Sequence, residues 1–237
     1  MNPKIEDIDR RIIELISERA RLHIEDIRSM PVGGYSPVDR ARLREIIDRC
    51  NPGPLPGDLL MKVYTEIVSG SMALGGPLSA AYFGPAGTFT HIALLEIFGE
   101  SITAIPYRTI PEVFQQVESG SVTCGVVPVE NSTEGAVTYT LDEFLDTDLM
   151  IVSEKFLRIS HNLVSLCDDV KKIKKLYSHP QPLGQCKQWL RENLPGVETI
   201  QVGSTSTAAE TASWDKYSAA IASEVSAKLN GLNVLAS

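Results

Sequence analysis

The spacing of apolar side chains changes once along this 237-residue chain, at the GGPLS stretch of residues 75–79, and this change constrains the fold most strongly. Before it, apolar residues recur every three to four positions, which is typical of amphipathic helices. After it, short apolar runs of strand length alternate with helix-like segments, which predicts a mostly parallel sheet with helices on both faces. The chain therefore divides into an all-helical domain at residues 1–76 and an α/β domain at residues 80–237.

The first part of the chain is predicted to hold three helices. Residues 4–29 place isoleucine and leucine on one helical face, Ser36 signals the start of a second helix, and Asp58 is expected to cap a third. Three helices in so short a segment enclose a thin core, so we expect this part to dimerise or to pack on its neighbour. Nine arginines lie in the first fifty residues, a number that suits either a solvated helix surface or the binding of small carboxylates.

Four polar clusters punctuate the α/β part. Strand-like runs are predicted at AAYFG, ITAIPY, CGVVPV, LMIVSEKFL, NLVSL, KKLYS, ETIQVG and SAAIA. The clusters follow such runs, at GPAGTFTH (84–91), PVENSTEG (128–135), SHPQPLGQC (178–186) and GSTSTAAE (203–210). In open α/β sheets, ligands bind where the carboxyl ends of strands meet the amino ends of helices. Each cluster alone fits an ordinary turn or cap, but together they indicate a hydroxyl- and amide-lined cleft for a small acidic molecule.

Three of these clusters carry specific expectations. Gln185 is predicted in the first turn of an amphipathic helix, where the helix dipole favours a negative ligand. Ser204 or Thr205 is predicted to cap the helix that follows. Glu130 and Asn131 are expected on the stiff end of a buried strand, although an Asx-type turn closed by a glycine is an open alternative.

Composition and motifs exclude several classes of protein. The net charge is −8, from 22 Lys and Arg against 30 Asp and Glu, which argues against a nucleic-acid or membrane partner. No apolar run reaches membrane-spanning length and the amino terminus lacks the features of a secretory signal, so a cytoplasmic protein is expected. No metal-ligand spacing, Walker loop, G-x-G-x-x-G or nucleophile elbow occurs, so no metal and no cofactor are expected. Four scattered cysteines are interpreted as reduced thiols: Cys50, Cys124, Cys167 and Cys186.

The four clusters, in this order and at comparable spacing, resemble the motifs of the prephenate dehydratase family. The arginine-rich helical part resembles the all-helical chorismate mutase domain that is fused to dehydratases in bacterial bifunctional enzymes. The resemblance implies two α/β lobes in the manner of a solute-binding protein, with the active site between them, and a homodimer. It implies a reaction of phenylalanine biosynthesis in which prephenate loses its ring carboxylate as CO2 and its ring hydroxyl as water, giving phenylpyruvate.

Site residues follow from the same resemblance. Asn131 and Gln185 are implied as catalytic contacts near the reacting ring. The implied lining residues are Thr88, Glu130, Ser132, Ser178, Gln181, Thr205 and Ser206. Arg19, Arg40 and Ser71 match the mutase site, whereas Met30, Ala41, Gly75 and Asn2 replace its lysine, glutamate, glutamine and first arginine. With half of the mutase groups replaced, a dimerisation or docking role is favoured over mutase activity.

Two family features do not occur in these 237 residues: the Thr-Arg-Phe motif that holds the family's catalytic threonine, and the carboxy-terminal ACT-type regulatory domain. These departures predict a truncated form of a longer enzyme. Two alternatives remain open. One is a chorismate mutase that carries an inert dehydratase fragment. The other is a non-catalytic protein that binds small carboxylates, since solute receptors share the two-lobe architecture.

Overall fold

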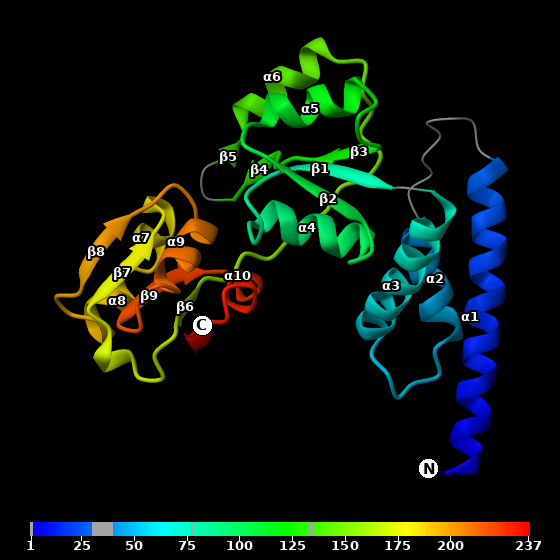
Figure 1. Ribbon diagram of the computed structural model, residues 1–237, viewed down its shortest axis with the longest axis horizontal. Helices are drawn as coiled ribbons and strands as arrows, with labels where there is room; N and C mark the ends of the chain where they lie inside the picture. The colour runs from blue at the N-terminus through cyan, green and yellow to red at the C-terminus, as the bar shows by residue number, and fades with distance from the viewer. Residues whose placement is uncertain (1, 30–39, 77, 133–134) are drawn as a thin grey trace. The chain divides into compact units, whose positions relative to one another are not determined.

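The structure is a computed structural model that describes residues 2–29, 40–76, 78–132 and 135–237 (Figure 1). Contacts along the chain divide it into two compact units. Unit 1 consists of Met1–Tyr82, Leu94–Ile105 and Ile110–Lys155. Unit 2 consists of Phe83–Ala93, Pro106–Thr109 and Phe156–Ser237. The units cut across the predicted domain boundary near residue 80, which stays a prediction.

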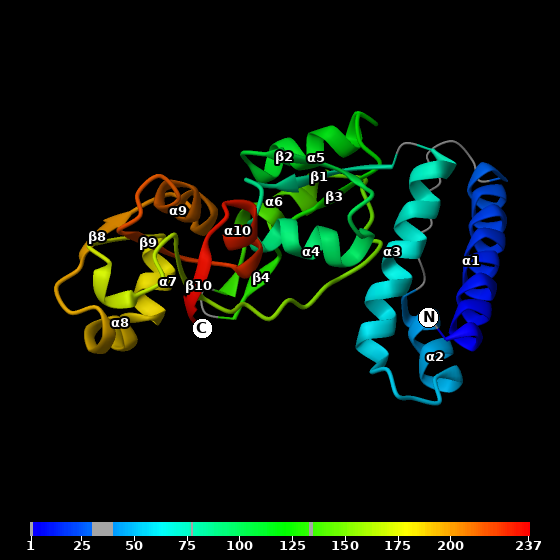
Figure 2. The same ribbon diagram turned by 60° about the horizontal axis from the view of Figure 1, so that its bottom comes forward.

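Unit 1 begins with three helices, as the apolar spacing predicts. They are α1 (Pro3–Ser29), α2 (Arg40–Cys50) and α3 (Gly57–Gly75). Figures 1 and 2 show α1 and α3 side by side, and Val68 and Met72 of α3 are buried. The apolar face of α1 is only half covered, because Ile5, Ile8 and Ile12 are 50%, 52% and 47% exposed. The expectation of a thin core is thus confirmed, while the predicted start of the second helix at Ser36 lies outside the described residues.

The prediction that Asp58 caps the third helix is wrong. Helix α3 begins at Gly57, with Pro56 at the cap position and no side-chain cap hydrogen bond. Asp58 lies in the first turn instead, and its carboxylate accepts a hydrogen bond of 2.5 Å from Nη1 of Arg44 on α2. The hydrogen bond and positive charge of Arg44 lower the pKa of Asp58. The proline fixes the backbone at the helix start, and the nearby guanidinium then offers this carboxylate a charged partner.

A three-stranded sheet forms the rest of the core of unit 1. Its order is β2-β1-β3, with β1 and β3 parallel. The strands are β1 (Ser79–Phe83), β2 (Thr103–Tyr107) and β3 (Cys124–Val126). The accompanying elements are α4 (Phe89–Phe98), α5 (Ile110–Glu118), the hairpin of β4 (Glu130–Asn131) and β5 (Gly135–Ala136), and α6 (Thr138–Asp146). Helix α4 belongs to unit 1 from Leu94 onward, while its residues up to Ala93 belong to unit 2. Ala80 and Tyr82 of β1 pack against Leu94 and Phe98 of α4 in a buried apolar cluster.

Unit 2 is built on a five-stranded sheet of order β10-β6-β9-β7-β8. Its strands are β6 (Asn162–Ser165), β7 (Lys175–Ser178), β8 (Glu198–Gln201), β9 (Ser218–Ala222) and β10 (Asn233–Ala236). Its helices are η1 (Val170–Lys172), α7 (Pro180–Gln185), α8 (Lys187–Asn193), α9 (Thr205–Ala212) and α10 (Glu224–Leu229). β7 pairs in parallel with both β8 and β9. β6 pairs antiparallel with β9, and β10 pairs antiparallel with β6. The sheet is therefore mixed rather than mostly parallel.

Helices cover both faces of this sheet, as predicted. On one face, Ala208 and Ala212 of α9 lie in a buried cluster with Ala220 and Ala222 of β9, where small side chains let the helix approach closely. On the other face, the cluster contains Ile221 of β9 together with side chains of α8. Successive residues of β9 thus enter opposite faces, which is the normal alternation of a strand.

One predicted strand does not form. Residues 147–161, which include the LMIVSEKFL run, contain no helix or strand. Met150 and Phe156 are 83% and 88% exposed, so this apolar run finds no strand neighbour within the described ranges. The CGVVPV run is also a strand only as far as Val126, because Pro128 has no backbone N–H to give to a ladder.

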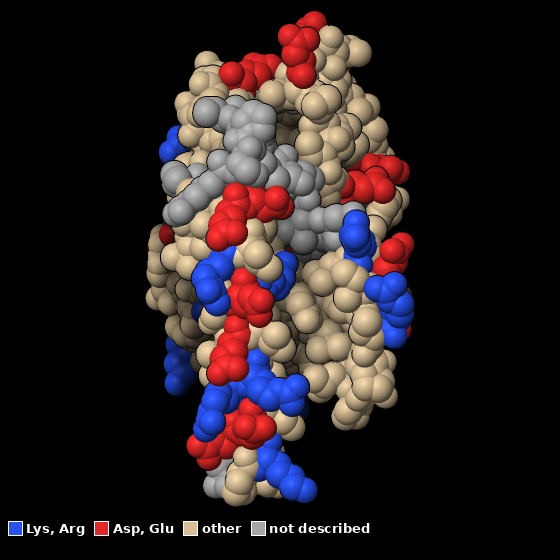
Figure 3. Space-filling model, turned by 90° about the vertical axis from the view of Figure 1, so that its right-hand side faces the viewer, with Lys and Arg blue, Asp and Glu red and all other residues tan. Residues whose placement is uncertain are grey.

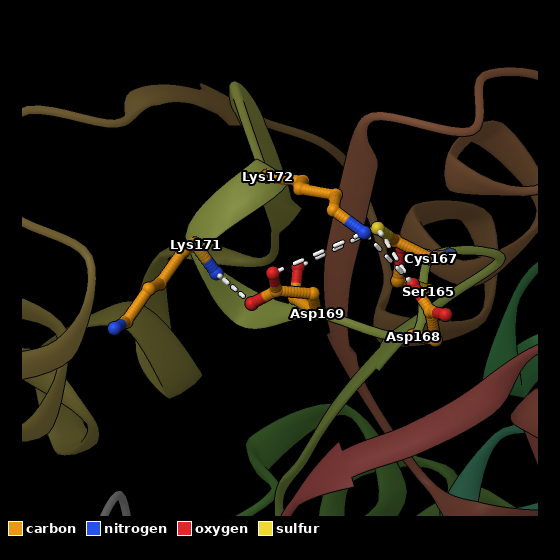
Figure 4. Close-up of polar contacts among 6 residues, drawn as sticks. All are labelled: Ser165, Cys167, Asp168, Asp169, Lys171 and Lys172. Carbon is orange, nitrogen blue, oxygen red and sulfur yellow. Dashed lines mark hydrogen bonds and ion pairs between the residues drawn. The ribbon is translucent and has the colours of Figure 1, made fainter.

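The turn after β6 anchors the amino end of β9. Ser165 donates to the carbonyl of Ser218 and accepts from the N–H of Cys167 (Figure 4). Asp169 then caps η1 by accepting from the N–H of Lys171, and Lys172 lies within 4 Å of both Asp169 and the preceding aspartate. These bonds lie at the amino end of β9, whereas the polar clusters at 178–186 and 203–210 follow the carboxyl ends of β7 and β8.

Candidate functional site

Three parallel strands end together at one edge of the five-stranded sheet. β7 pairs in parallel with β8 and with β9, so their carboxyl ends coincide, and α7, α9 and α10 begin just beyond them. β6 runs antiparallel to β9 with Asn162 opposite Ala222, so His161, just before β6, lies at the same edge. The clusters at 178–186 and 203–210 therefore meet at the carboxyl edge, where open α/β sheets bind ligands.

The loop between β1 and α4 is hydrogen-bonded to this edge. The carbonyl of Ala86 accepts from the hydroxyl of Ser206, and the carbonyl of Gly87 accepts from the hydroxyls of Ser223 and Ser226, both at 3.0 Å. Gly87 has a φ of +83°, and a Cβ there would lie 2.5 Å from the hydroxyl oxygens of Ser206 and Ser226. Only glycine fits this position, so the loop of the first cluster and two helix starts form one packed structure.

Within that loop, Thr88 and His91 bond to the loop itself. The hydroxyl of Thr88 donates to the carbonyl of Pro85 at 2.9 Å. The N–H of Gly87 donates to Nδ1 of His91 at 3.0 Å, which assigns the ring hydrogen of neutral His91 to Nε2. Burial lowers the pKa of His91 and so favours this neutral form.

The predicted residues of the 203–210 cluster form the start of α9. Ser204 is the cap, and its hydroxyl accepts from the N–H of Thr207 at 3.0 Å, which confirms that prediction. Thr205 follows as a half-buried first helical residue, and Ser206 is 5% exposed with its hydroxyl within 3.0 Å of that of Ser226. Substrate contact by Thr205 and Ser206 stays a prediction.

The 178–186 cluster folds differently from the expectation. α7 begins at Pro180, with His179 as its cap accepting from the N–H of Gln181, and Ser178 is fully buried and donates to the carbonyl of His179. Gln185 is therefore the last residue of α7 and not in a first turn. The prediction that the helix dipole favours a negative ligand beside Gln185 is wrong, because Pro180 fixes the helix start five residues earlier.

Gln185 is instead bonded to a histidine that the sequence interpretation left out of the site. Its Oε1 lies 2.7 Å from Nε2 of His161, and the imidazole meets the ring of Phe89 edge to face, with ring centres 6.1 Å apart. Nδ1 of His161 and Nε2 of Gln181 are buried and have no hydrogen-bond partner in the described part of the chain. Only strand pairing brings His161 to this edge, so sequence spacing carries no signal for it.

The 128–135 cluster belongs to unit 1. Glu130 and Asn131 form strand β4, which pairs antiparallel with β5 so that Asn131 is opposite Gly135. Glu130 and Ser132 are exposed and Asn131 is half-buried. A short hairpin therefore holds these side chains, in place of the expected end of a buried strand, and residues 133 and 134 lie outside the described residues.

The model of the family described as prephenate dehydratase matches residues 80–237. The chain belongs to the prephenate dehydratase family. It is 43% identical to a bifunctional chorismate mutase/prephenate dehydratase of Stutzerimonas stutzeri, over 98% of this chain and 66% of that protein. A protein of the same name from Aquifex aeolicus is 41% identical, over 100% of this chain and 67% of that protein. The chain thus spans about two thirds of the length of these relatives.

Solved structures of prephenate dehydratases have the same fold. The structure of prephenate dehydratase in complex with L-Phe from Arthrobacter aurescens is 34% identical, with a TM-score of 0.61 over 67% of this chain and 55% of that chain. The prephenate dehydratase of Staphylococcus aureus is 28% identical, with a TM-score of 0.58 over 67% of this chain and 60% of that chain. These likenesses support the α/β architecture of the dehydratase part.

The helical segment that precedes the dehydratase match contains a hollow beside α1. It measures about 600 Å³ and is lined by Arg19, Leu22, His23, Glu25 and Asp26. Nη1 of Arg19 and Nδ1 of His23 are buried without a partner among the residues described. Burial, and then the charge of Arg19, lower the pKa of His23.

The other two residues matched to the mutase site are Ser71 and Arg40. Ser71 is 3% exposed, and its hydroxyl donates to the carbonyl of Ile67 on its own helix. Arg40 begins α2, but its side chain lies outside the described part of the structure. Figure 3 shows basic and acidic side chains interleaved on the side where α1 lies, which is typical of a solvated helix surface.

The described residues offer neither a metal site nor a membrane-spanning helix. Within the described ranges, no group of three or more His, Cys, Asp or Glu side chains is placed to hold a metal ion. None of the described helices is both long and apolar enough to span a bilayer. All four cysteines are free thiols, and burial raises the pKa of Cys124 to about 12.

Proposed function

We propose that this chain binds prephenate and converts it to phenylpyruvate. The observation that carries this proposal is the match of residues 80–237 to the prephenate dehydratase family. It is supported by the packing of the loop at 84–91 on the starts of α9 and α10 in unit 2. Asn131 and Gln185 are proposed as the catalytic contacts. The proposed lining residues are Thr88, Glu130, Ser132, Ser178, Gln181, Thr205 and Ser206.

The chemistry suits neutral amides and hydroxyls. The electron pair of the bond to the ring carboxylate moves into the ring as CO2 departs, the ring becomes aromatic, and the ring C–O bond breaks. The departing hydroxide takes up one proton and leaves as water. Aromatisation supplies the driving force, so the protein must orient a dicarboxylate and help protonate the leaving group, which N–H and O–H donors can do without a metal or cofactor.

Turnover of prephenate by the purified chain tests this function. Phenylpyruvate should form faster than in the spontaneous reaction, and Asn131→Ala or Gln185→Ala should each lower kcat/KM by about 100-fold, the usual effect of removing one donor to a developing charge. Gln188→Ala is the matched control, since Gln188 is an exposed amide on α8 that bonds Glu192.

A folded chain that gives no phenylpyruvate above the spontaneous rate would refute the proposed activity. Calorimetric binding of prephenate without turnover would instead favour a non-catalytic small-carboxylate-binding protein. Wild-type kinetics in both alanine variants would refute the assignment of Asn131 and Gln185 while leaving the activity itself in place.

We also infer that the helical segment is a chorismate mutase-like domain that mainly mediates dimerisation. The names of the bifunctional relatives support the likeness, and the half-exposed Ile5, Ile8 and Ile12 on α1 support a second copy as the partner. Light scattering should therefore report a dimer, and Ile8→Glu should shift it to monomer. Wild type that is monomeric at micromolar concentration would contradict this inference.

An active mutase is the alternative for this domain, with Arg19, Arg40 and Ser71 as its site. Arg19→Ala decides between them: loss of chorismate consumption with unchanged turnover of supplied prephenate favours an active mutase. Absence of chorismate consumption in wild type ends that alternative.

The free thiols support a reducing compartment, and we propose that the protein acts in the cytoplasm.

A further inference from the structure

We propose that His161 is a positioning residue for the dehydratase site, which holds the side-chain amide of Gln185 in one orientation. The proposal rests on the proposed function, in which Gln185 contacts the substrate. It adds to that function a residue that contributes through Gln185 and that lies outside the four polar clusters. All groups concerned, namely His161, Gln185, Gln181 and Phe89, belong to unit 2.

The contact defines which atoms donate and accept. Nε2 of His161 and Oε1 of Gln185 are 2.7 Å apart, a hydrogen-bond distance. An amide oxygen only accepts, so the imidazole N–H donates and the ring hydrogen lies on Nε2. The bond therefore directs the oxygen of the Gln185 amide to His161 and fixes the orientation of the whole side-chain amide.

The burial of the other ring nitrogen favours the same tautomer. Nδ1 of His161 is buried without a partner in the described part of the chain. In the tautomer with hydrogen on Nε2, this nitrogen is an unpaired acceptor, whereas the other tautomer would bury an unpaired N–H there and lose the bond to Gln185. The bond to Gln185 and the burial of Nδ1 both favour the tautomer with hydrogen on Nε2, so His161 is the donor to Gln185.

Packing holds the imidazole in place. The ring of Phe89 meets it edge to face, at a centre-to-centre distance of 6.1 Å and an interplanar angle of 69°. Phe89 is the first residue of α4 and follows the loop whose Gly87 carbonyl is bonded to Ser223 and Ser226. The position of His161 is thus tied to the packed loop on one side and to Gln185 on the other.

The neighbouring amide points to the same location. Gln181 lies one turn before Gln185 on α7, so the two side chains share a helix face. Nε2 of Gln181 is buried and unpartnered within the described ranges. A buried donor without a partner is costly, and a polar ligand beside α7 would satisfy it. The Gln185 amide that His161 orients therefore lies one helical turn from the Gln181 amide, whose Nε2 has no hydrogen-bond partner among the described residues.

A double-mutant cycle tests whether His161 acts through Gln185. His161→Leu removes the donor and retains an apolar group, so kcat on prephenate should fall about 10- to 100-fold, with a smaller change in KM, because a misoriented contact affects the reacting geometry most. His161→Gln places an amide N–H near the former Nε2–H and should recover most of the loss. In the Gln185→Ala background, His161→Leu should cause no further loss.

Wild-type kinetics in His161→Leu would overturn the proposal, as would losses that multiply in the double variant. If the wild-type chain binds prephenate without turning it over, the same cycle is measured on its dissociation constants, with the same criteria. Tryptophan fluorescence controls for folding of the variants, because Trp189 and Trp214 both lie in unit 2.

The ¹⁵N spectrum of the imidazole tests the hydrogen bond without any catalytic readout. The Nε2–H form of His161 should dominate in wild type and give way to a mixture in Gln185→Ala. A dominant Nδ1–H form in wild type would overturn the positioning role even where the chain is an active dehydratase. An inactive chain that retains the Nε2–H signature would instead refute the proposed function and leave the pair intact.

Discussion

Replacing Gly87 with alanine tests how the loop between β1 and α4 packs on the sheet edge. Gly87 has a φ of +83°, a conformation that costs an L-residue about 1–2 kcal/mol. The new Cβ would lie 2.5 Å from the hydroxyl oxygens of Ser206 and Ser226, which are 5% and 0% exposed and cannot turn to solvent. Each buried hydrogen bond that is lost costs about 1–3 kcal/mol, so we expect a total loss of about 4 kcal/mol.

Urea unfolding followed by tryptophan fluorescence measures this loss in unit 2, where Trp189 and Trp214 lie. Gly196→Ala is the matched control, because Gly196 has a φ of +79° in the same unit but nothing within 4 Å of the added Cβ. It should cost about 1–2 kcal/mol from backbone conformation alone. Equal losses in the two variants would refute the packing argument, since only the backbone term would then remain.

Two further predictions concern titration and thiol reactivity. Burial lowers the pKa of His91 in the folded protein below its usual value of 6.5. Between these two pKa values the unfolded chain binds more protons than the folded chain, so the stability contributed by neutral His91 is lost as the pH falls from 6.5 through the folded pKa. Urea midpoints at pH 7.5 and 5.5 should therefore differ less in His91→Gln than in wild type, and an unchanged difference would contradict the assignment. In the native protein, a thiol reagent should modify the exposed Cys50 first, whereas Cys124, buried with a pKa of about 12, should react only on unfolding. The fast phase of thiol modification should therefore disappear in Cys50→Ser. Its disappearance in Cys124→Ser instead would contradict this prediction.

Local patterns were sufficient where one element decides its own structure. The runs NLVSL and SAAIA become strands β6 and β9, and Ser204 caps α9 because a serine side chain reaches the backbone of its own helix. Errors arose where a distant residue competes. Asp58 bonds Arg44 instead of its own backbone, and the apolar run near Met150 lies in a described segment, 147–161, that forms no helix or strand.

The candidate site divides in the same way. The four clusters and their order are present in the sequence, and with them the family resemblance that the match over residues 80–237 confirms. Whether Ser206 bonds a ligand or the loop carbonyl of Ala86 depends on a contact between residues 120 positions apart, which no local pattern encodes. Substrate contact by the predicted residues stays a prediction.

The sequence by itself determined most of the helices and strands and the positions of the polar clusters, because spacing and capping act over a few residues. The tertiary structure alone decided that β6 runs antiparallel to β9, and this pairing sets His161 beside Gln185. It also decided that Gly87 must be a glycine for its packing, since the two serines that crowd it belong to helices far along the chain. Strand pairing and close packing join residues distant in sequence, so their consequences appear only when the chain is folded.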